Sequence, residues 1–168
     1  MFSLETERLK IIPLTTELLI LCRQTRGLME KALGLRITSM NPDPPEMLEA
    51  LEEMIRSSID DPARWKWHTN WEIALKSENR IVGGAAFYGP PDSDGICETG
   101  YIIQESYRNR GFASEAVKAI SSWALSNGAK TVKADTEESN AGSIKTLLKC
   151  GFIQISNIKG IMTFEKQA

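Results

Sequence analysis

The sequence offers little for a metal centre or a disulfide framework. It has one histidine, His68, and three widely spaced cysteines, Cys22, Cys97 and Cys150, with no CxxC pair and no Cys/His cluster. We therefore expect no metal site. An odd number of scattered cysteines suits a reducing compartment, so a cytoplasmic protein is expected.

Long runs of one charge and long apolar runs are also missing. The 20 basic and 22 acidic residues give a formal net charge of −2 without a Lys/Arg cluster, whereas nucleic-acid binding usually needs a basic face. No apolar stretch approaches the ~20 residues that cross a bilayer, and the charged, alternating start at residues 1–13 is unlike a signal peptide. Neither a nucleic acid nor a membrane is an expected partner.

What is present is the composition of an ordinary globular protein. With 42% hydrophobic and 25% charged residues, a chain of this length can bury a core without disulfides, which favours one domain over residues 1–168. The order of helical and alternating apolar patterns predicts a mixed α/β layer with helices on both faces of a sheet. The expected strands are 9–13, 71–75, 81–87, 96–103, 131–134, 152–155 and 161–164, and the expected helices lie around 18–22, 47–59, 116–124 and 144–148.

A strand, a glycine turn and a helix follow one another in the second half of the chain. Such a turn leaves the first N–H groups of the helix without intrahelical partners, and the helix dipole favours a phosphate there. Gly111 lacks a Cβ and Ala113 is small, so the backbone can approach an oxygen closely. Arg108, Arg110 and Ser114 can add donors. The pattern lacks the lysine of a nucleoside-triphosphate loop and the dinucleotide fingerprint, and alone it is equally typical of a turn that binds nothing.

With its surroundings, this turn resembles the GNAT superfamily of N-acetyltransferases. Arg108-x-x-Gly111-x-Ala113 is similar to the Q/R-x-x-G-x-G/A motif with which that family grips the pyrophosphate of acetyl-CoA. Three further segments resemble the superfamily in order and spacing, namely 98–103, 140–143 and 149–152. The opening segment 4–14 is similar to that of the RimJ/RimL-like branch, which acetylates protein N-termini or small amines.

The resemblance implies a fold and a co-substrate. The fold is a GNAT-like, mostly antiparallel α/β sheet that splays beside the strand at 98–103, with helices on both faces, and the co-substrate is acetyl-CoA without a metal. Pantetheine lies along the strand in this family, so its backbone partners here are Ile102 and Ile103. The residues that the resemblance assigns to cofactor binding are Ile102, Ile103, Arg108, Asn109, Arg110, Gly111, Phe112, Ala113, Ser114 and Asn140.

The same resemblance implies direct transfer to a neutral amine, without a cysteine nucleophile. An amine with a pKa of about 10 is mostly protonated at pH 7, so a base is needed. Glu98 lies where this branch often places a glutamate, although a solvated or arginine-paired glutamate is the alternative. Many members supply a tyrosine as acid for the leaving thiolate seven residues after the helix asparagine, and Leu147 stands there instead. Ser143 matches a serine of the RimL-like branch, yet it can equally cap the helix or face solvent, and Asn140 is also a good N-cap.

Two other groups have both a functional and a structural interpretation. Trp65, Trp67 and His68 could line an acceptor pocket or a dimer surface, but a core role is favoured, and nothing nearby in the sequence orients His68 as a base. Acidic residues after the strand at 131–134 could join Glu98 in a rim that attracts a cationic amine, although ordinary solvated charges are favoured. These acidic residues are Asp135, Glu137 and Glu138.

Three functional hypotheses follow from these patterns. The first is an N-acetyltransferase acting on a protein N-terminus or a small amine. The second is an acetyl-CoA-binding module without efficient turnover, which only the missing tyrosine favours. The third is a different phosphate ligand at the glycine turn, which the ordered match over 96–152 makes the weakest. An exposed final strand could support a homodimer.

Overall fold

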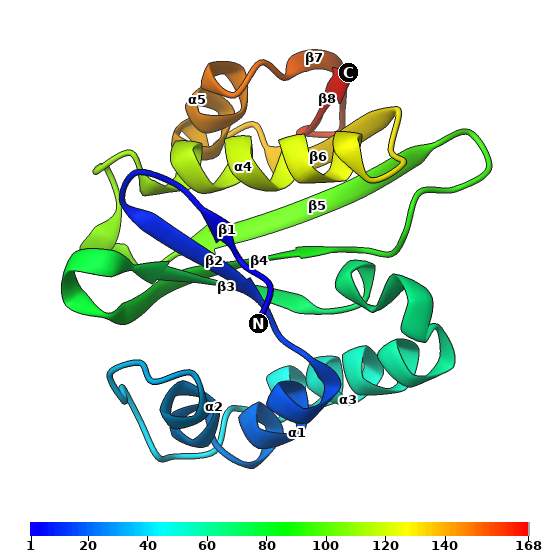
Figure 1. Cartoon of the computed structure of the whole chain (residues 1–168). Helices are drawn as coiled ribbons and strands as arrows, with labels where there is room; N and C mark the ends of the chain where they lie inside the picture. The colour runs from blue at the N-terminus through cyan, green and yellow to red at the C-terminus, as the bar shows by residue number, and fades with distance from the viewer. Residues whose placement is uncertain (168) are drawn as a thin grey trace. The chain divides into compact units, whose positions relative to one another are not determined.

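The computed structural model describes residues 1–167 (Figure 1). The chain divides into two compact units, the first spanning Met1–Ala86 and the second beginning at Phe87. Each unit combines strands with helices, and among the strand pairs that residues 1–167 form within the units only one is parallel. The predicted mixed, mostly antiparallel α/β class is therefore confirmed.

In the first unit, four antiparallel strands lie in sequence order. In the third strand, every residue from Trp71 to Leu75 is buried. Trp71 is fully buried and its indole N–H donates to the Lys66 carbonyl at 2.9 Å. The strands are β1 (Leu4–Glu5), β2 (Leu9–Pro13), β3 (Asn70–Leu75) and β4 (Arg80–Phe87).

Three helices complete the first unit. Thr15 caps the first of them by accepting from the Leu18 N–H at 3.4 Å. Pro45 begins the third, where its missing N–H costs nothing. Apolar side chains from all three helices and β4 form one buried cluster. The helices are α1 (Thr16–Gln24), α2 (Arg26–Ala32) and α3 (Pro45–Asp60).

In the second unit, four strands lie in the order β5, β6, β8, β7. β5 is parallel to β6 only from Ile96 to Glu98, which face Thr131 to Lys133. β6 pairs with β8 along its whole length instead. Because the β5–β6 pairing stops at Glu98, the two strands separate beyond it, as the predicted splay requires. The strands are β5 (Ile96–Ile103), β6 (Thr131–Glu137), β7 (Ile153–Ile158) and β8 (Ile161–Gln167).

Two helices pack beside this splayed pair (Figure 1). α4 (Phe112–Ser126) buries the predicted stripe that includes Ala116, Val117 and Ile120, and it packs on β5 and β6. α5 (Ala141–Lys149) packs on α4 and β6. The splay is thus flanked by the N-terminal ends of two helices.

Several details of the fold differ from the prediction, including the strands expected at 152–155 and 161–164, which span Ile153–Ile158 and Ile161–Gln167. β6 extends three residues beyond Ala134 because β8 continues to pair with it as far as Glu137. Leu148 was expected to be buried with Leu147, but it is 54% exposed while Leu147 is fully buried. Adjacent helical positions are about 100° apart, and α5 is placed so that Leu147, rather than Leu148, faces the core. The short strand β1 is not evident from the sequence.

Candidate functional site

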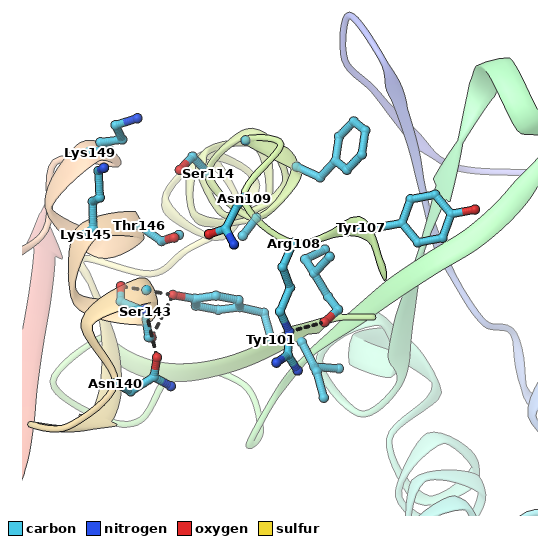
Figure 2. Close-up of a pocket in the computed structure, with 16 residues that line it drawn as sticks. Tyr101, Tyr107, Arg108, Asn109, Ser114, Asn140, Ser143, Lys145, Thr146 and Lys149 are labelled. Carbon is cyan, nitrogen blue, oxygen red and sulfur yellow. Dashed lines mark hydrogen bonds between the residues drawn. The ribbon is translucent and has the colours of Figure 1, made fainter. Parts of the chain in front are cut away.

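A cavity of about 430 Å³ lies within the second unit (Figure 2). Its volume falls within the range of ligand pockets. Three segments enclose it: the end of β5, the turn into α4, and the exposed face of α5's first turns. The lining residues are Tyr101, Ile102, Ile103, Tyr107, Arg108, Asn109, Gly111, Phe112, Ala113, Ser114, Asn140, Gly142, Ser143, Lys145, Thr146 and Lys149.

The turn before α4 presents open backbone donors. Gly111 is the N-cap of α4 with φ 82°, and Asn109 has φ 60°, so two left-handed residues shape the turn. Glycine tolerates this region at no steric cost, and asparagine does so better than most residues. Within residues 1–167, the N–H groups of Gly111, Ala113 and Ser114 donate no hydrogen bond. They line the cavity at a helix N-terminus, which is the arrangement that binds phosphate groups.

The basic residues that line the cavity differ from those that the motif indicates. Arg108 lines the cavity, and its Nε donates to the Ile103 carbonyl at 3.0 Å. Arg110 is not among the lining residues, and its guanidinium lies 5.1 Å from the centre of the Phe112 ring. Lys145 and Lys149, one turn apart on α5, line the cavity instead. Sequence reasoning missed both lysines.

The end of β5 forms the opposite wall of the cavity. Ile102 is 64% exposed and Ile103 is buried, as expected for successive residues of a strand. The Ile103 carbonyl already accepts from Arg108, so one of its two acceptor positions is occupied. The resemblance to the GNAT superfamily predicts that pantetheine contacts the remaining backbone groups of Ile102 and Ile103.

The first turn of α5 brings a serine and a tyrosine together. Asn140 caps the helix by accepting from the Ser143 N–H at 3.0 Å, so its predicted capping role is confirmed. The Ser143 hydroxyl lies 3.0 Å from the Tyr101 hydroxyl of β5 (Figure 2). Burial raises the pKa of Tyr101, against smaller lowering contributions from the hydroxyls of Ser143 and Thr146. Leu147 is fully buried in the core, so no donor occupies the usual tyrosine position.

Glu98 lies at the last paired position of β5 and outside the cavity lining. Because it is three residues from Tyr101, its side chain projects from the other face of the strand. Burial raises the pKa of Glu98, Asp135 raises it further, and Lys133 lowers it. Of the three acidic residues considered for a rim, Asp135 and Glu137 lie in β6 and are exposed, and Glu138 accepts from Asn157 at 3.0 Å. Of these three, only Asp135 acts on the pKa of Glu98, and the acidic rim stays a prediction.

The aromatic group lies in the first unit and is largely structural. Trp67 and Trp71 are buried in its core, as favoured. Lys66 lies 5.0 Å from the centre of the Trp65 ring. The expectation that nothing nearby orients His68 was wrong, because its Nε2 is 3.2 Å from Asp61 Oδ2. Asp61 is seven residues earlier, across a proline that turns the chain back.

All three cysteines are buried and unpaired. Burial raises the pKa of Cys22 to about 12 and that of Cys97 to about 11. Cys150 packs beneath α4, with its Sγ 3.2 Å from the Ser114 carbonyl oxygen. Thiols with such raised pKa values are poor nucleophiles, which agrees with their interpretation as packed residues.

The structure also bears on membrane spans and metal sites. No helix in the described chain combines the length and hydrophobicity needed to cross a membrane. Over residues 1–167, there is also no group of three or more His, Cys, Asp or Glu side chains that could hold a metal ion.

Comparison with known proteins identifies the family. Residues 15–153 match the model of the acetyltransferase (GNAT) domain. The uncharacterized N-acetyltransferase YjdG of Bacillus subtilis (strain 168) is 33% identical over 154 residues, which cover 91% of this chain and 90% of that protein. The match crosses both units of the chain.

Solved structures show the same fold. RimL, a ribosomal alpha-N-protein acetyltransferase solved with coenzyme A, aligns over 99% of this chain and 98% of its own with a TM-score of 0.68 and 13% identity. Spermidine N-acetyltransferase from Vibrio cholerae, solved with CoA and spermine, aligns over 96% of both chains with a TM-score of 0.65 and 13% identity. The chain belongs to the GNAT family of acetyltransferases and is an acetyl-CoA-dependent acyltransferase.

Proposed function

We propose that this enzyme is an N-acetyltransferase of the RimJ/RimL-like branch that transfers the acetyl group directly to a primary amine, either a protein N-terminus or a small amine. The observation that carries the proposal is the set of unbonded amides at the Gly111 turn, which face a cavity running along β5 to the splay. The names of the similar proteins support both acceptor classes, since RimL is a protein acetyltransferase and the Vibrio cholerae structure is a spermidine acetyltransferase.

In this proposal the diphosphate of CoA accepts from the amides of Gly111, Ala113 and Ser114. The α4 dipole adds to these donors because the amides lie at its positive end. Asn109, Arg110 and Phe112 shape the turn, since Asn109 adopts the left-handed conformation and Arg110 lies over the Phe112 ring. Arg108 secures the end of β5 through Ile103 and keeps its remaining guanidinium donors for phosphate.

Pantetheine then lies along β5, against the backbone of Ile102 and Ile103 and beside Asn140 of α5. From Ile103 back to Glu98 the strand spans about 17 Å, at roughly 3.3 Å per residue. The arm ends where β5 and β6 separate, which puts the thioester between Ser143 on one side of β5 and Glu98 on the other.

Chemistry at the thioester needs a base for the amine and a donor for the sulfur. We assign Glu98 as the base, because a carboxylate with a raised pKa accepts a proton more readily near neutral pH. Asp135 next to it favours a cationic acceptor. We assign Ser143 as the donor to the leaving sulfur, since Leu147 cannot serve.

Lys149→Gln is expected to weaken CoA binding about fivefold. An exposed ion pair contributes about 0–1 kcal/mol, and about 1.4 kcal/mol corresponds to tenfold. The effect should shrink as salt is added, because exposed charges are screened. Isothermal titration at two ionic strengths measures it, with Lys159→Gln, at the β7–β8 turn, as the control. Equal affinities for the two variants would exclude a role for Lys149.

The pH dependence of transfer should shift in opposite directions in two neighbouring variants. Glu98 acts when ionised, so kcat/KM falls as pH falls through its raised pKa. Asp135→Asn removes a charge that raises this pKa and moves the acidic limb to lower pH, whereas Lys133→Gln removes a charge that lowers it and moves the limb to higher pH. The acceptor's own ionisation is common to both profiles and cancels in the comparison. Shifts in the same direction would contradict the assignment of Glu98.

The alternative is an acetyl-CoA-binding module without efficient turnover, which the buried Leu147 favours. Calorimetry with acetyl-CoA, followed by thiol release across a panel of amines and peptides, tests both. Binding with thiol release supports the enzyme, and binding without release from any acceptor supports the module. No binding at sub-millimolar acetyl-CoA would overturn the site itself.

The family match across both units supports a single catalytic domain over residues 1–168. We propose a cytoplasmic location from the three unpaired cysteines. The final strand, which was expected to support a homodimer, is β8, and it is paired on both sides by β6 and β7. A homodimer through the edge strand β7 is therefore proposed instead, because Ile153 and Ile158 on it are 65% and 67% exposed.

A further inference from the structure

Tyr101 extends from the middle of β5 across the cavity to α5 (Figure 2). Its hydroxyl is 3.0 Å from the Ser143 hydroxyl and 3.4 Å from the Ser143 carbonyl oxygen. The two residues are 42 positions apart in the chain and come from opposite walls of the cavity. This contact joins the wall along which pantetheine lies to the helix that carries the proposed sulfur donor.

The 3.0 Å contact itself fits either hydroxyl as donor, so we infer the direction from the second contact and from the protonation of the phenol. Hydroxyl–hydroxyl bonds are usually 2.5–3.0 Å long, so Ser143 Oγ is a better acceptor for the Tyr101 proton than the carbonyl at 3.4 Å. Burial raises the pKa of Tyr101, and its electrostatic interaction with Cys150 raises the pKa further. The phenol therefore stays protonated at neutral pH and is available as a donor. With its oxygen accepting from Tyr101, Ser143 keeps its own O–H hydrogen for another acceptor.

No other side chain holds the Ser143 hydroxyl in the described part of the chain. The Ser143 N–H is bonded to Asn140, and its hydroxyl contacts only Tyr101. A serine hydroxyl rotates freely unless a partner fixes it. Tyr101 thus determines which way this donor points.

We propose that Tyr101 is a positioning residue that holds the Ser143 hydroxyl with its hydrogen directed at the leaving sulfur of CoA, in place of the tyrosine that Leu147 replaces on α5. The inference rests on the proposed function and deepens it. The tyrosine hydroxyl that many members of the family carry on the helix would thus be supplied here from β5, by Tyr101.

The chemical balance shows why Tyr101 acts through Ser143 and keeps its proton. The acceptor nitrogen forms the new bond to the acetyl carbon, the C–S bond breaks, and its electron pair stays on sulfur. Nitrogen gives one proton to the base, and sulfur takes one from solvent, while the Ser143 hydroxyl donates a hydrogen bond to the sulfur and keeps its proton. A phenol has a pKa of about 10 and a thiol about 8.5, so transfer of the tyrosine proton to the thiolate is uphill. Stabilisation by an oriented hydrogen bond needs no such transfer.

The test uses the thiol pKa of CoA bound to the enzyme, read from the ultraviolet absorbance of the thiolate. A donor aimed at sulfur favours the thiolate and lowers this pKa. In Tyr101→Phe the thiol pKa should rise, in Ser143→Ala it should rise as much or more, and the double variant should match Ser143→Ala. Tyr88→Phe, which alters an exposed tyrosine outside the cavity, should leave it unchanged. This readout needs no acceptor amine.

Turnover supplies a second readout. Tyr101→Phe should lower kcat about tenfold or more, as expected for loss of an oriented bond to a charged group, while the dissociation constant of acetyl-CoA stays the same. Ser143→Thr retains a hydroxyl and should retain most of the rate, whereas Ser143→Ala should not. Additive losses in the double variant, or an unchanged thiol pKa in Tyr101→Phe, would overturn the inference.

A substitution that keeps both the ring and the hydroxyl of Tyr101 guards against a variant that does not fold. With 3-fluorotyrosine in place of Tyr101, the hydroxyl becomes a stronger donor, and the thiol pKa of bound CoA should fall below that of the wild type. An unchanged or higher value contradicts the inference. Failure of wild-type enzyme to bind CoA would instead overturn the proposed function, so the two failures are distinguishable.

Discussion

Gly111→Glu is expected to abolish acetyl-CoA binding. The substitution places a carboxylate beside the unbonded amides of the α4 N-terminus, where the diphosphate should lie. It also adds a Cβ at φ 82°, a conformation that glutamate adopts poorly. Losing two charge-assisted hydrogen bonds at roughly 1.5–3 kcal/mol each corresponds to a loss of roughly 10²–10⁴-fold in affinity. Isothermal titration with acetyl-CoA measures the loss.

The matched control is Gly34→Glu in the first unit. Gly34 is also left-handed, with φ 69°, and an added Cβ there would meet nothing within 4 Å. Both variants carry the same backbone strain and the same new charge, but only Gly111→Glu changes the helix N-terminus. Gly34→Glu should bind acetyl-CoA as the wild type does. Tight binding by Gly111→Glu would place the diphosphate elsewhere.

Glu98→Gln is expected to lower the rate of transfer by roughly 10²–10⁴-fold, the usual contribution of a general base. Acetyl-CoA affinity should not change, because Glu98 projects from the other face of β5 and does not line the cavity. The deficit should diminish as pH approaches 10, where the free amine no longer needs a base. Steady-state rates over pH, with calorimetric affinities, measure both effects.

Glu105→Gln serves as the control for charge. Glu105 is an exposed glutamate just beyond the end of β5, so its loss changes net charge equally but leaves the splay untouched. Its rate should match the wild type throughout the pH range. A Glu98→Gln enzyme with wild-type kcat near neutral pH would refute the assignment of Glu98 and leave a water-mediated route or another base.

The glycine-turn end of the candidate site, where we propose that the cofactor binds, had a predictable local structure because its segments are neighbours in the sequence. Gly111, the helix that follows it and the strand before it are neighbours in the sequence, and their propensities agree with the structure. The bounds of β2 and β5 coincide with those predicted, since both end at clear changes of pattern. Asn140 was predicted as an N-cap for the same reason.

The catalytic end was less predictable because its contacts join distant segments. The Tyr101–Ser143 contact depends on how far β5 and β6 separate, which no periodicity records. Lys145 and Lys149 were missed because an exposed polar stripe on a helix usually faces only solvent. The Asp61–His68 contact joins the two residues that flank a short 3-10 helix, Pro62–Trp67, whose start at a proline is visible in the sequence.

The extension of β6 beyond Ala134 could not be predicted from the residues that form it. Beyond Ala134 the strand alternates exposed and buried residues, but all of them are polar, namely Asp135, Thr136 and Glu137. Polar alternation does not distinguish a strand from a loop. The pairing with β8 decides the outcome, and that pairing is a tertiary effect.

The most direct test of the account is a crystal structure of the enzyme with acetyl-CoA. The account predicts diphosphate oxygens within hydrogen-bonding distance of the N–H groups of Gly111, Ala113 and Ser114, with the thioester sulfur beside Ser143. A coenzyme whose diphosphate lies away from these amides, with the amides bonded inside the protein, would contradict it.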